Sequence, residues 1–282
     1  MEIGFNDLKG KICVLTGGAG VIGSTIAEGL ARLGVKMVIA DINEDMAREV
    51  AASILEKTGS TCMGIAANVL DKASLESVHE KIRRELGEID ILINGAGGNS
   101  PKATTKHEEM NKENMNDLEG TFFGLEMEGF KKVFDLNFMG TLLPSMVFAK
   151  DMVKKGKGVI LNVSSMNSFR PLTKIPAYSA AKASVNNFTE WLAVHLAKTG
   201  IRVNSIAPGF FLTNQNRFLL LDENTRELTP RGNKIISNTP MGRFGDTEEL
   251  VGTVAYLISD ISKFVTGVNI PVDGGFNAYS GV

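Results

Sequence analysis

One tyrosine of the chain stands where a tyrosine can transfer protons. Of the three tyrosines, only Tyr178 is followed four residues later by a lysine, Lys182. Residues four apart share a helix face, so the ammonium can lie beside the phenol and lower its pKa. Ser165 follows a strand-like run, and its hydroxyl can hold a substrate oxygen toward the phenol. A bare tyrosine–lysine pair is common on helices, but the three side chains together predict acid–base chemistry at a carbonyl or an alcohol.

A glycine-rich turn predicts where a nucleotide binds. Residues 16–23 read TGGAGVIG, between a strand-like run and a helix. Glycines allow close approach to a pyrophosphate, and the helix N-terminus supplies amide donors. Asp41 ends the next apolar run, where a carboxylate can bind the ribose of NAD and repel the 2′-phosphate of NADP. We therefore expect NAD(H) to be preferred over NADP(H); the alternative is a packing turn and a helix-capping aspartate.

Two weaker signals extend this expected cofactor site. Residues 94–97 (NGAG) end a further strand at the same sheet edge, although an Asn-Gly pair is as often only a turn. Asn68 and Val69 follow another strand and are expected near the adenine. The expected cofactor contacts from these segments are Gly17, Gly18, Gly20, Val21, Ile22, Gly23, Asp41, Asn68, Val69, Asn94, Ala96 and Gly97.

The elements that position these residues alternate between strands and helices. Apolar runs rich in β-branched residues lie near 11–15, 35–40, 62–66, 89–94, 158–163, 201–207 and 268–272, with amphipathic stretches between most of them. This pattern predicts βαβ crossovers. We expect one domain over residues 1–282, with a doubly wound, Rossmann-like, mostly parallel sheet of seven strands and helices on both faces.

Two long polar stretches interrupt this alternation, near residues 99–128 and 210–240. We call them the first and the second insertion. Unstructured loops of this length are uncommon in compact domains and often bind ligands. We expect the second insertion to be a substrate lid because it leaves the carboxyl end of a strand; surface decoration or short helices are the alternatives.

The composition is that of an ordinary globular enzyme. The 282 residues are 43% hydrophobic and 22% charged, with a formal net charge of −2, so we expect neither nucleic acid nor a membrane as partner. Cys13 and Cys62 are expected to be buried free thiols, and the three histidines lack metal-ligand spacing, so no metal is expected. The N-terminus lacks a signal-peptide pattern and no apolar run is long enough to span a membrane, so we expect a cytoplasmic protein.

Over nearly its whole length the chain resembles the short-chain dehydrogenase/reductase superfamily. The resemblance rests on the glycine turn, residues 94–97, Asn137 in LNFMG, Ser165, Tyr178, Lys182, Pro208-Gly209 and the terminal VDGG of residues 272–275. It implies a catalytic tetrad of Asn137, Ser165, Tyr178 and Lys182, with Tyr178 as proton donor in reduction and acceptor in oxidation. It also implies that Lys182 and Tyr178 contact the nicotinamide ribose, that Pro208 and Gly209 contact the cofactor, and that Asn137 anchors a water. Homotetramers are usual in the superfamily.

One departure from the superfamily pattern concerns the glycine turn. Val21 stands where the single-domain branch usually has its middle glycine, and the spacing fits the longer nucleotide-sugar epimerases instead. The chain, however, ends soon after the VDGG motif. The single-domain branch therefore remains the better match.

Several segments resemble one subgroup, the bacterial D-mannonate oxidoreductases, or fructuronate reductases. They are residues 164–182, 207–221, 228–245 and 272–282. The resemblance implies a keto sugar acid as substrate, D-fructuronate reduced to D-mannonate or the reverse. Candidate substrate residues are Asn167, Arg170 and Arg217, with Arg231 and Lys234 as further cations. Alternatives are a gluconate 5-dehydrogenase-like enzyme, a 3-oxoacyl-carrier reductase, a nucleotide-sugar epimerase and a non-catalytic NAD-binding regulator.

Overall fold

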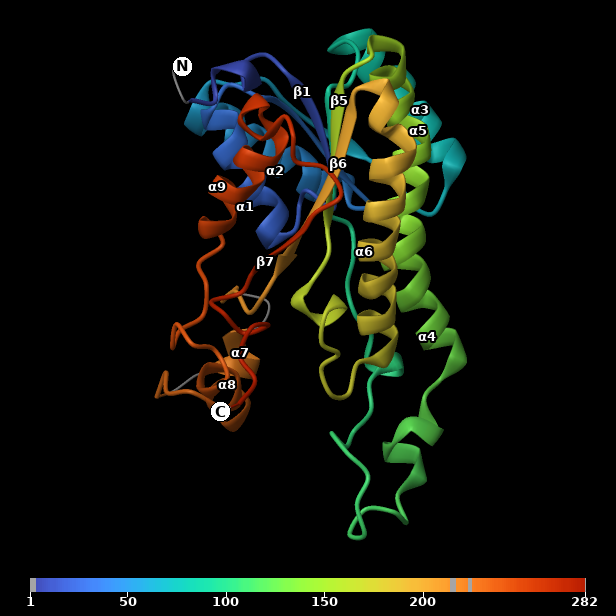
Figure 1. Cartoon of the computed structure of the whole chain (residues 1–282), viewed down its shortest axis with the longest axis vertical. Coiled ribbons are helices and arrows are strands. Elements are labelled where there is room, and N and C mark those ends of the chain that lie inside the picture. Colours follow the sequence, from blue (N-terminus) through green and yellow to red (C-terminus); the bar gives the residue numbers. More distant parts are fainter. Residues whose placement is uncertain (1–3, 214–216, 223–224, 282) are drawn as a thin grey trace.

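A single parallel sheet forms the centre of the molecule (Figure 1). The computed structural model describes residues 4–213, 217–222 and 225–281. The strand order is β3-β2-β1-β4-β5-β6-β7, and every neighbouring pair is parallel. The strands are β1 (Ile12–Thr16), β2 (Lys36–Asp41), β3 (Cys62–Ala66), β4 (Ile91–Asn94), β5 (Gly158–Val163), β6 (Ile201–Pro208) and β7 (Asn269–Val272). The predicted doubly wound seven-stranded fold is confirmed.

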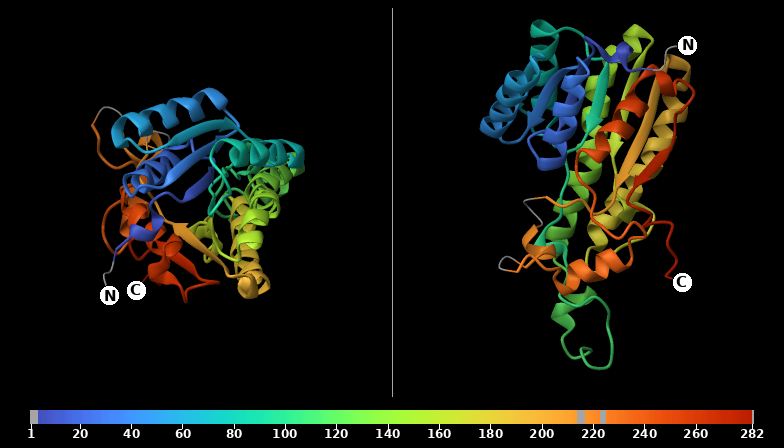
Figure 2. Two further views of the ribbon diagram at one scale, coloured as in Figure 1. Left: turned by 90° about the horizontal axis from the view of Figure 1, so that it is seen from above. Right: turned by 90° about the vertical axis from the view of Figure 1, so that its left-hand side faces the viewer.

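Helices cover both faces of the sheet. One face carries α1 (Val21–Arg32), α2 (Glu44–Thr58) and α9 (Glu249–Ile258). The other carries α3 (Lys72–Glu85), α5 (Gly140–Lys155) and α6 (Pro176–Leu196). Helix α4 (Met127–Phe134) continues through a π-helical turn, Asp135–Met139, directly into α5. The two layers are visible from above in Figure 2.

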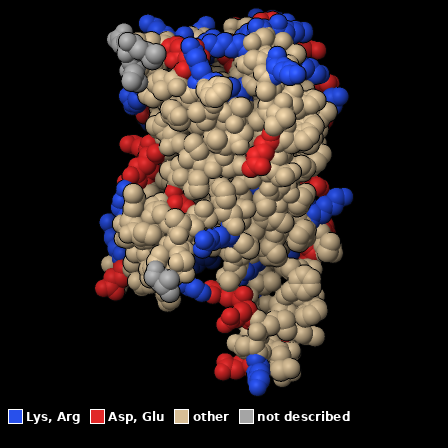
Figure 3. Space-filling model, viewed as in Figure 1, with Lys and Arg blue, Asp and Glu red and all other residues tan. Residues whose placement is uncertain are grey.

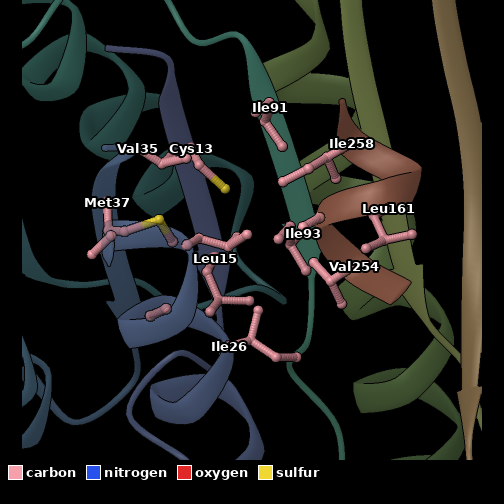
Figure 4. Packing of buried hydrophobic residues seen from close by; sticks show 14 of the residues in the cluster. Cys13, Leu15, Ile26, Val35, Met37, Ile91, Ile93, Leu161, Val254 and Ile258 are labelled. Atoms are coloured by element: carbon pink, nitrogen blue, oxygen red, sulfur yellow. The ribbon is translucent and has the colours of Figure 1, made fainter. Parts of the chain in front are cut away.

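Each face of the sheet has its own hydrophobic core, because successive strand residues point to opposite faces. In β1, Cys13 and Leu15 belong to the core under α1, α2 and α9, whereas Val14 belongs to the core under α3, α5 and α6. Figure 4 shows the first of these cores, where Leu15, Ile26 and Val254 come from a strand and two different helices. The chain thus places two apolar layers around strands that are buried on both sides.

The helix boundaries follow ordinary capping chemistry. The Asn43 side chain accepts from the Met46 amide at the start of α2, and Asp71 accepts from the amides of Ala73 and Ser74 at the start of α3. Gly59 ends α2 with a left-handed backbone, φ +70°. These local signals explain why the predicted positions of the helices agree with the structure.

The two insertions project beyond the carboxyl ends of the strands (Figures 1 and 2). The first contains three short 3₁₀ turns, Pro101–Ala103, Leu118–Gly120 and Phe122–Gly124, and runs into α4. The second contains two short helices, α7 (Arg217–Leu220) and α8 (Pro230–Ser237). Both insertions therefore lie at the sheet edge where such folds bind ligands.

Both cysteines are free, Cys13 buried and Cys62 half-buried. Burial raises the pKa of the Cys62 thiol to about 12, so this thiol remains protonated at neutral pH. No helix in the described part of the chain is long and apolar enough to cross a membrane.

Candidate active site

A cavity of about 780 Å³ opens at the carboxyl ends of the central strands. Its walls come from the segments that follow β1, β4, β5 and β6, together with Asp41 at the end of β2 and the first two turns of α6. The predicted site residues that line it are Gly17, Gly20, Val21, Ile22, Gly23, Asp41, Gly97, Ser165, Tyr178, Lys182, Pro208 and Gly209. The fold thus brings together residues that are up to about two hundred positions apart in the sequence, from Leu15 to Thr213.

The glycine turn needs its glycines at two positions. Gly17 has φ +65°, and a Cβ atom there would lie 2.7 Å from the Ala96 Cα. A Cβ atom on Gly23 would lie 2.5 Å from the Gly17 carbonyl oxygen. Val21, which replaces the glycine usual in the single-domain branch, begins α1 directly after the Gly20 cap. Its side chain lines the cavity and does not fill it. The turn provides a backbone cradle of the kind that a pyrophosphate requires.

Asp41 holds its carboxylate beside this cradle. One carboxylate oxygen accepts from the Ala19 amide at 3.1 Å, and the other accepts from the Asn43 amide at 3.1 Å. The two bonds fix the orientation of the side chain, and Asp41 lines the cavity. The carboxylate of Asp41 therefore places a fixed negative charge in the cavity wall, where β2 ends.

The remaining predicted cofactor residues lie outside the cavity lining. Asn94 is buried, and its amide nitrogen donates to the Ser145 hydroxyl and the Asn162 side-chain oxygen, both at 2.9 Å. Asn68 caps a local turn by accepting from the Leu70 amide. Gly18, Val69 and Ala96 are also outside the lining; a Cβ atom on Gly18 would lie 2.9 Å from the Leu15 carbonyl oxygen.

The serine, tyrosine and lysine meet in the cavity as predicted. The Ser165 side chain lies close enough to the Tyr178 phenol to lower the pKa of that phenol, and the Ser165 oxygen accepts from the Asn167 amide at 3.3 Å. The Lys182 Nζ lies 5.7 Å from the centroid of the Tyr178 ring and donates to the Val163 carbonyl oxygen at 2.7 Å. This arrangement can deliver a proton to an oxygen held near Ser165.

The electrostatics of the pair differ from the expectation. Burial raises the pKa of the Tyr178 phenol, and the interaction with Ser165 offsets this only in part. Burial also lowers the pKa of Lys182 to about 8. The direction is thus opposite to the expected lowering of the tyrosine pKa, because burial of the phenol outweighs the effects that favour the phenolate.

Asn137 lies in the π-helical turn between α4 and α5 and is fully buried. Its side-chain nitrogen donates to the carbonyl oxygens of Gly98 and Val133, and its oxygen accepts from the Gly98 amide. A Cβ atom on Gly97 would lie 2.6 Å from the Asn137 side-chain oxygen and 3.3 Å from the Lys182 Nζ. Asn137 therefore fixes the backbone after β4 close to the lysine.

The three candidate substrate residues occupy different surroundings. Asn167 is 5% exposed, and its buried side-chain oxygen has no hydrogen-bond partner. Arg170 is exposed and donates to the Tyr279 carbonyl oxygen at 3.1 Å. Arg217 is exposed at the start of α7, outside the cavity lining. Asn167 is the one that lies beside Ser165, and none of the three lines the cavity.

The structure also adds lining residues that motif reading missed. Besides Leu15 in β1 and Ile26 in α1, they are Gly98, Asn99, Val163, Ser164, Phe210, Phe211 and Thr213. Each lies at or just after the end of β4, β5 or β6. Taking the first residues after every predicted strand would have found them, because ligands in such sheets bind outside the carboxyl ends of the strands.

Known proteins with the same arrangement cover almost the entire chain. A protein-family model described as Enoyl-(Acyl carrier protein) reductase matches residues 17–277. A Haemophilus influenzae protein described as an uncharacterized oxidoreductase is 49% identical over 100% of this chain and 99% of its own length. A 2-dehydro-3-deoxy-D-gluconate 5-dehydrogenase from Formosa agariphila is 32% identical, over 100% of this chain and 98% of its own.

A solved structure agrees closely with the fold. It is a crystal structure from Haemophilus influenzae, described as a candidate D-mannonate oxidoreductase with bound NAD. It superposes with a TM-score of 0.92 at 49% identity and covers 98% of each chain. With the family model, the relatives and the serine–tyrosine–lysine site in agreement, the chain belongs to the short-chain dehydrogenase/reductase family of oxidoreductases.

Proposed function

We propose that the protein is an NAD(H)-dependent oxidoreductase that reduces a keto sugar acid, D-fructuronate to D-mannonate or the reverse. The observation that carries the proposal is a single cavity lined by the glycine turn, Asp41 and the Ser165–Tyr178–Lys182 group. The NAD bound in the Haemophilus influenzae structure and its description as a D-mannonate oxidoreductase support the same assignment. The homotetramer and the cytoplasmic location expected from the sequence stay predictions.

The residues present fit a dinucleotide. The backbone cradle of Gly17 and Gly23 would hold the pyrophosphate, and the carboxylate of Asp41 would accept from ribose hydroxyls. Lys182 would donate to the nicotinamide ribose. Bound NADH supplies the hydride that the carbonyl carbon of the substrate accepts. The negative charge of Asp41 disfavours a 2′-phosphate, so we propose a preference for NAD(H) over NADP(H).

The chain itself supplies positioning and the proton. Ser165 would donate a hydrogen bond to the substrate carbonyl oxygen and hold it against the phenol of Tyr178. Because burial raises the pKa of that phenol, it stays protonated at neutral pH and can donate to the oxygen during reduction. Asn137 would keep the backbone after β4 in place beside Lys182.

Polar groups near the serine suit a polyhydroxy substrate. Asn99 lines the cavity and presents an amide to it. The side-chain oxygen of Asn167, two residues after Ser165, is also without a partner, but it is buried outside the cavity lining. An acyl-carrier substrate would have no use for these groups along its alkyl chain, so the site favours the sugar acid.

Product analysis tests this proposal. Purified protein incubated with NADH and D-fructuronate should consume both and form D-mannonate, identified by chromatography against an authentic standard. 5-Ketogluconate serves as the parallel substrate for the gluconate 5-dehydrogenase-like alternative. Conversion of a nucleotide sugar without net NADH consumption would instead indicate an epimerase and overturn the proposal.

A further inference from the structure

The two insertions meet through an ion pair. Glu108 of the first insertion pairs with Lys234 on α8 of the second, 126 residues away in the sequence. Both side chains are well exposed, 44% and 63% respectively. Exposed pairs of this kind contribute little to stability. Stability alone is therefore a weak reason for joining the two insertions at this point.

Lys234 pairs directly with the carboxylate of Glu108, Lys174 lines the same pocket, and Arg231 adds its positive charge. The pKa of Glu108 is lowered first by the hydrogen bond from Lys234 and then by the positive charges of Lys234, Lys174 and Arg231. Glu109 is the next residue and lines the same shallow pocket as Glu108 and Lys174. Counting both acids, the cluster still has a surplus of positive charge. Such a surplus is suited to an additional anion.

The backbone of Lys174 is strained. Its φ is +75°, a left-handed conformation that among the described non-glycine residues occurs otherwise only at Arg226. Glycine or asparagine would adopt it at lower cost. The Thr105 amide of the first insertion donates to the Lys174 carbonyl oxygen at 2.9 Å and helps to hold it. A strained residue held in place near a catalytic group points to a functional role for its side chain.

The cluster is carried by the same three segments that border the catalytic cavity, although its own residues lie outside the lining of that cavity. Each of the three segments that carry it also supplies a cavity-lining residue: Asn99 from the first insertion, Thr213 from the second, and Tyr178 four residues after Lys174. In Figure 3 a hollow separates the two projecting parts of the molecule, with blue and red atoms on its edges. Of the described residues that line the cavity itself, only Lys182 is cationic, and it donates to Val163.

We propose that Lys174, Arg231 and Lys234 form the subsite for the carboxylate of an acidic substrate, and that Glu108 occupies this subsite until the substrate displaces it. The inference rests on the proposed function and deepens it. Exchange of one carboxylate for another keeps the charge of the cluster constant, and the released Glu108 side chain is already largely solvated. A neutral ketose cannot make this exchange, so the cluster selects acids over neutral sugars.

Opposite changes in KM for the glutamate and lysine variants would distinguish this role from a purely structural contact between the insertions. Glu108→Gln removes the competing charge and should lower the KM for D-fructuronate about threefold. Lys234→Met and Lys174→Met remove a cation from the substrate carboxylate and should raise that KM about tenfold. The KM for D-fructose, the neutral ketose, should change less than twofold in all three.

Two control variants accompany this set. Lys234→Arg keeps the charge and should keep the KM for D-fructuronate near that of the natural protein. Lys263→Met removes an equally exposed lysine that pairs with Asp260 near the end of α9 and should leave both KM values unchanged. If Glu108→Gln and Lys234→Met shift the KM in the same direction for both ketoses, the ion pair only holds the two insertions together and the inference is wrong.

Failure of the inference is distinguishable from failure of the proposed function. Turnover of D-fructuronate by the natural protein with unchanged KM values in all variants overturns the inference alone. If the natural protein shows no turnover, the dissociation constant of D-mannonate from NAD⁺-saturated protein, measured by calorimetry, gives the second readout. Tighter binding by Glu108→Gln and weaker binding by Lys234→Met would support the subsite, whereas no binding by the natural protein would overturn it together with the proposed function.

Discussion

At the scale of single residues, the site is arranged to keep a proton on Tyr178. Burial raises the pKa of the phenol, and burial lowers the pKa of Lys182 to about 8. Sequence spacing correctly placed the two side chains together but assigned the wrong sign to the tyrosine pKa. The sign depends on the burial of the phenol, and the spacing of two residues does not contain that quantity.

The two directions of the reaction should respond to pH in opposite ways. A raised pKa extends the protonated form of Tyr178 to higher pH, so the rate of ketone reduction should be nearly constant from about pH 6 to pH 8 and fall in alkaline solution. Alcohol oxidation needs the deprotonated phenol and should become faster over the same alkaline range. Measured kcat profiles that fall together with rising pH would contradict this role.

Asp41 should decide between the two nicotinamide cofactors. Asp41→Asn removes the negative charge but retains an oxygen that can accept from the Ala19 amide. We expect kcat/KM for NADPH relative to NADH to rise about tenfold or more, a change of roughly 1.4 kcal/mol. Asp41→Ala, which removes the hydrogen bonds as well, serves as the comparison. An unchanged ratio in both variants would remove Asp41 from this role.

At the scale of elements, some residues at the strand ends line the cavity, whereas others make hydrogen bonds inside the molecule. Sequence motifs correctly located the glycine turn after β1 and the serine after β5, because these signatures reflect local backbone needs. Asn94 also ends a strand, yet it pairs in register with Asn162 of β5 and bonds to that residue's side chain inside the molecule. Which face a strand-end side chain takes depends on register across the sheet, and the sequence does not give that register.

Comparing Gly17 with Gly59 distinguishes the effect of a left-handed backbone conformation from the effect of close packing around a glycine. Both have positive φ, but a Cβ atom on Gly17 would lie 2.7 Å from the Ala96 Cα, whereas one on Gly59 would have nothing within 4 Å. Gly59→Ala should cost about 1 kcal/mol of the free energy of unfolding and leave NADH binding intact. Gly17→Ala should cost more and abolish NADH binding. Urea unfolding and NADH fluorescence titration measure both, and normal NADH binding by Gly17→Ala would contradict the proposed cradle.

At the scale of the whole molecule, the alternation of strands and helices was sufficient to predict the doubly wound sheet. The arrangement of the two insertions was not, because Glu108 and Lys234 are 126 residues apart and no periodic pattern relates them. Long-range contacts of exposed charges depend on where the loops come to lie, which only the folded chain determines. The outer face of α6 is likewise known only from the folded chain: Trp191 on this helix is 56% exposed in the single chain.

This exposed face leads to a prediction about assembly. Val194 is 80% exposed on the same helix as Trp191, and apolar side chains grouped in this way mark contact surfaces. We expect the natural protein to have four times the 30.3 kDa mass of one chain by light scattering, and Val194→Glu to reduce that mass. Exposed Lys198→Glu, on the 3₁₀ turn after α6, is the control. A natural protein that is already monomeric would contradict the expectation.

The most direct test of the account is the initial rate of NADH oxidation with D-fructuronate, compared between the natural protein and Tyr178→Phe. The account predicts turnover by the natural protein and a loss of about a thousandfold or more in the variant, with NADH binding retained, because the ring remains and only the proton donor is removed. Turnover that survives in Tyr178→Phe would contradict the proton-transfer role. Natural protein that binds NADH but oxidises it with neither D-fructuronate nor 5-ketogluconate would contradict the sugar-acid assignment.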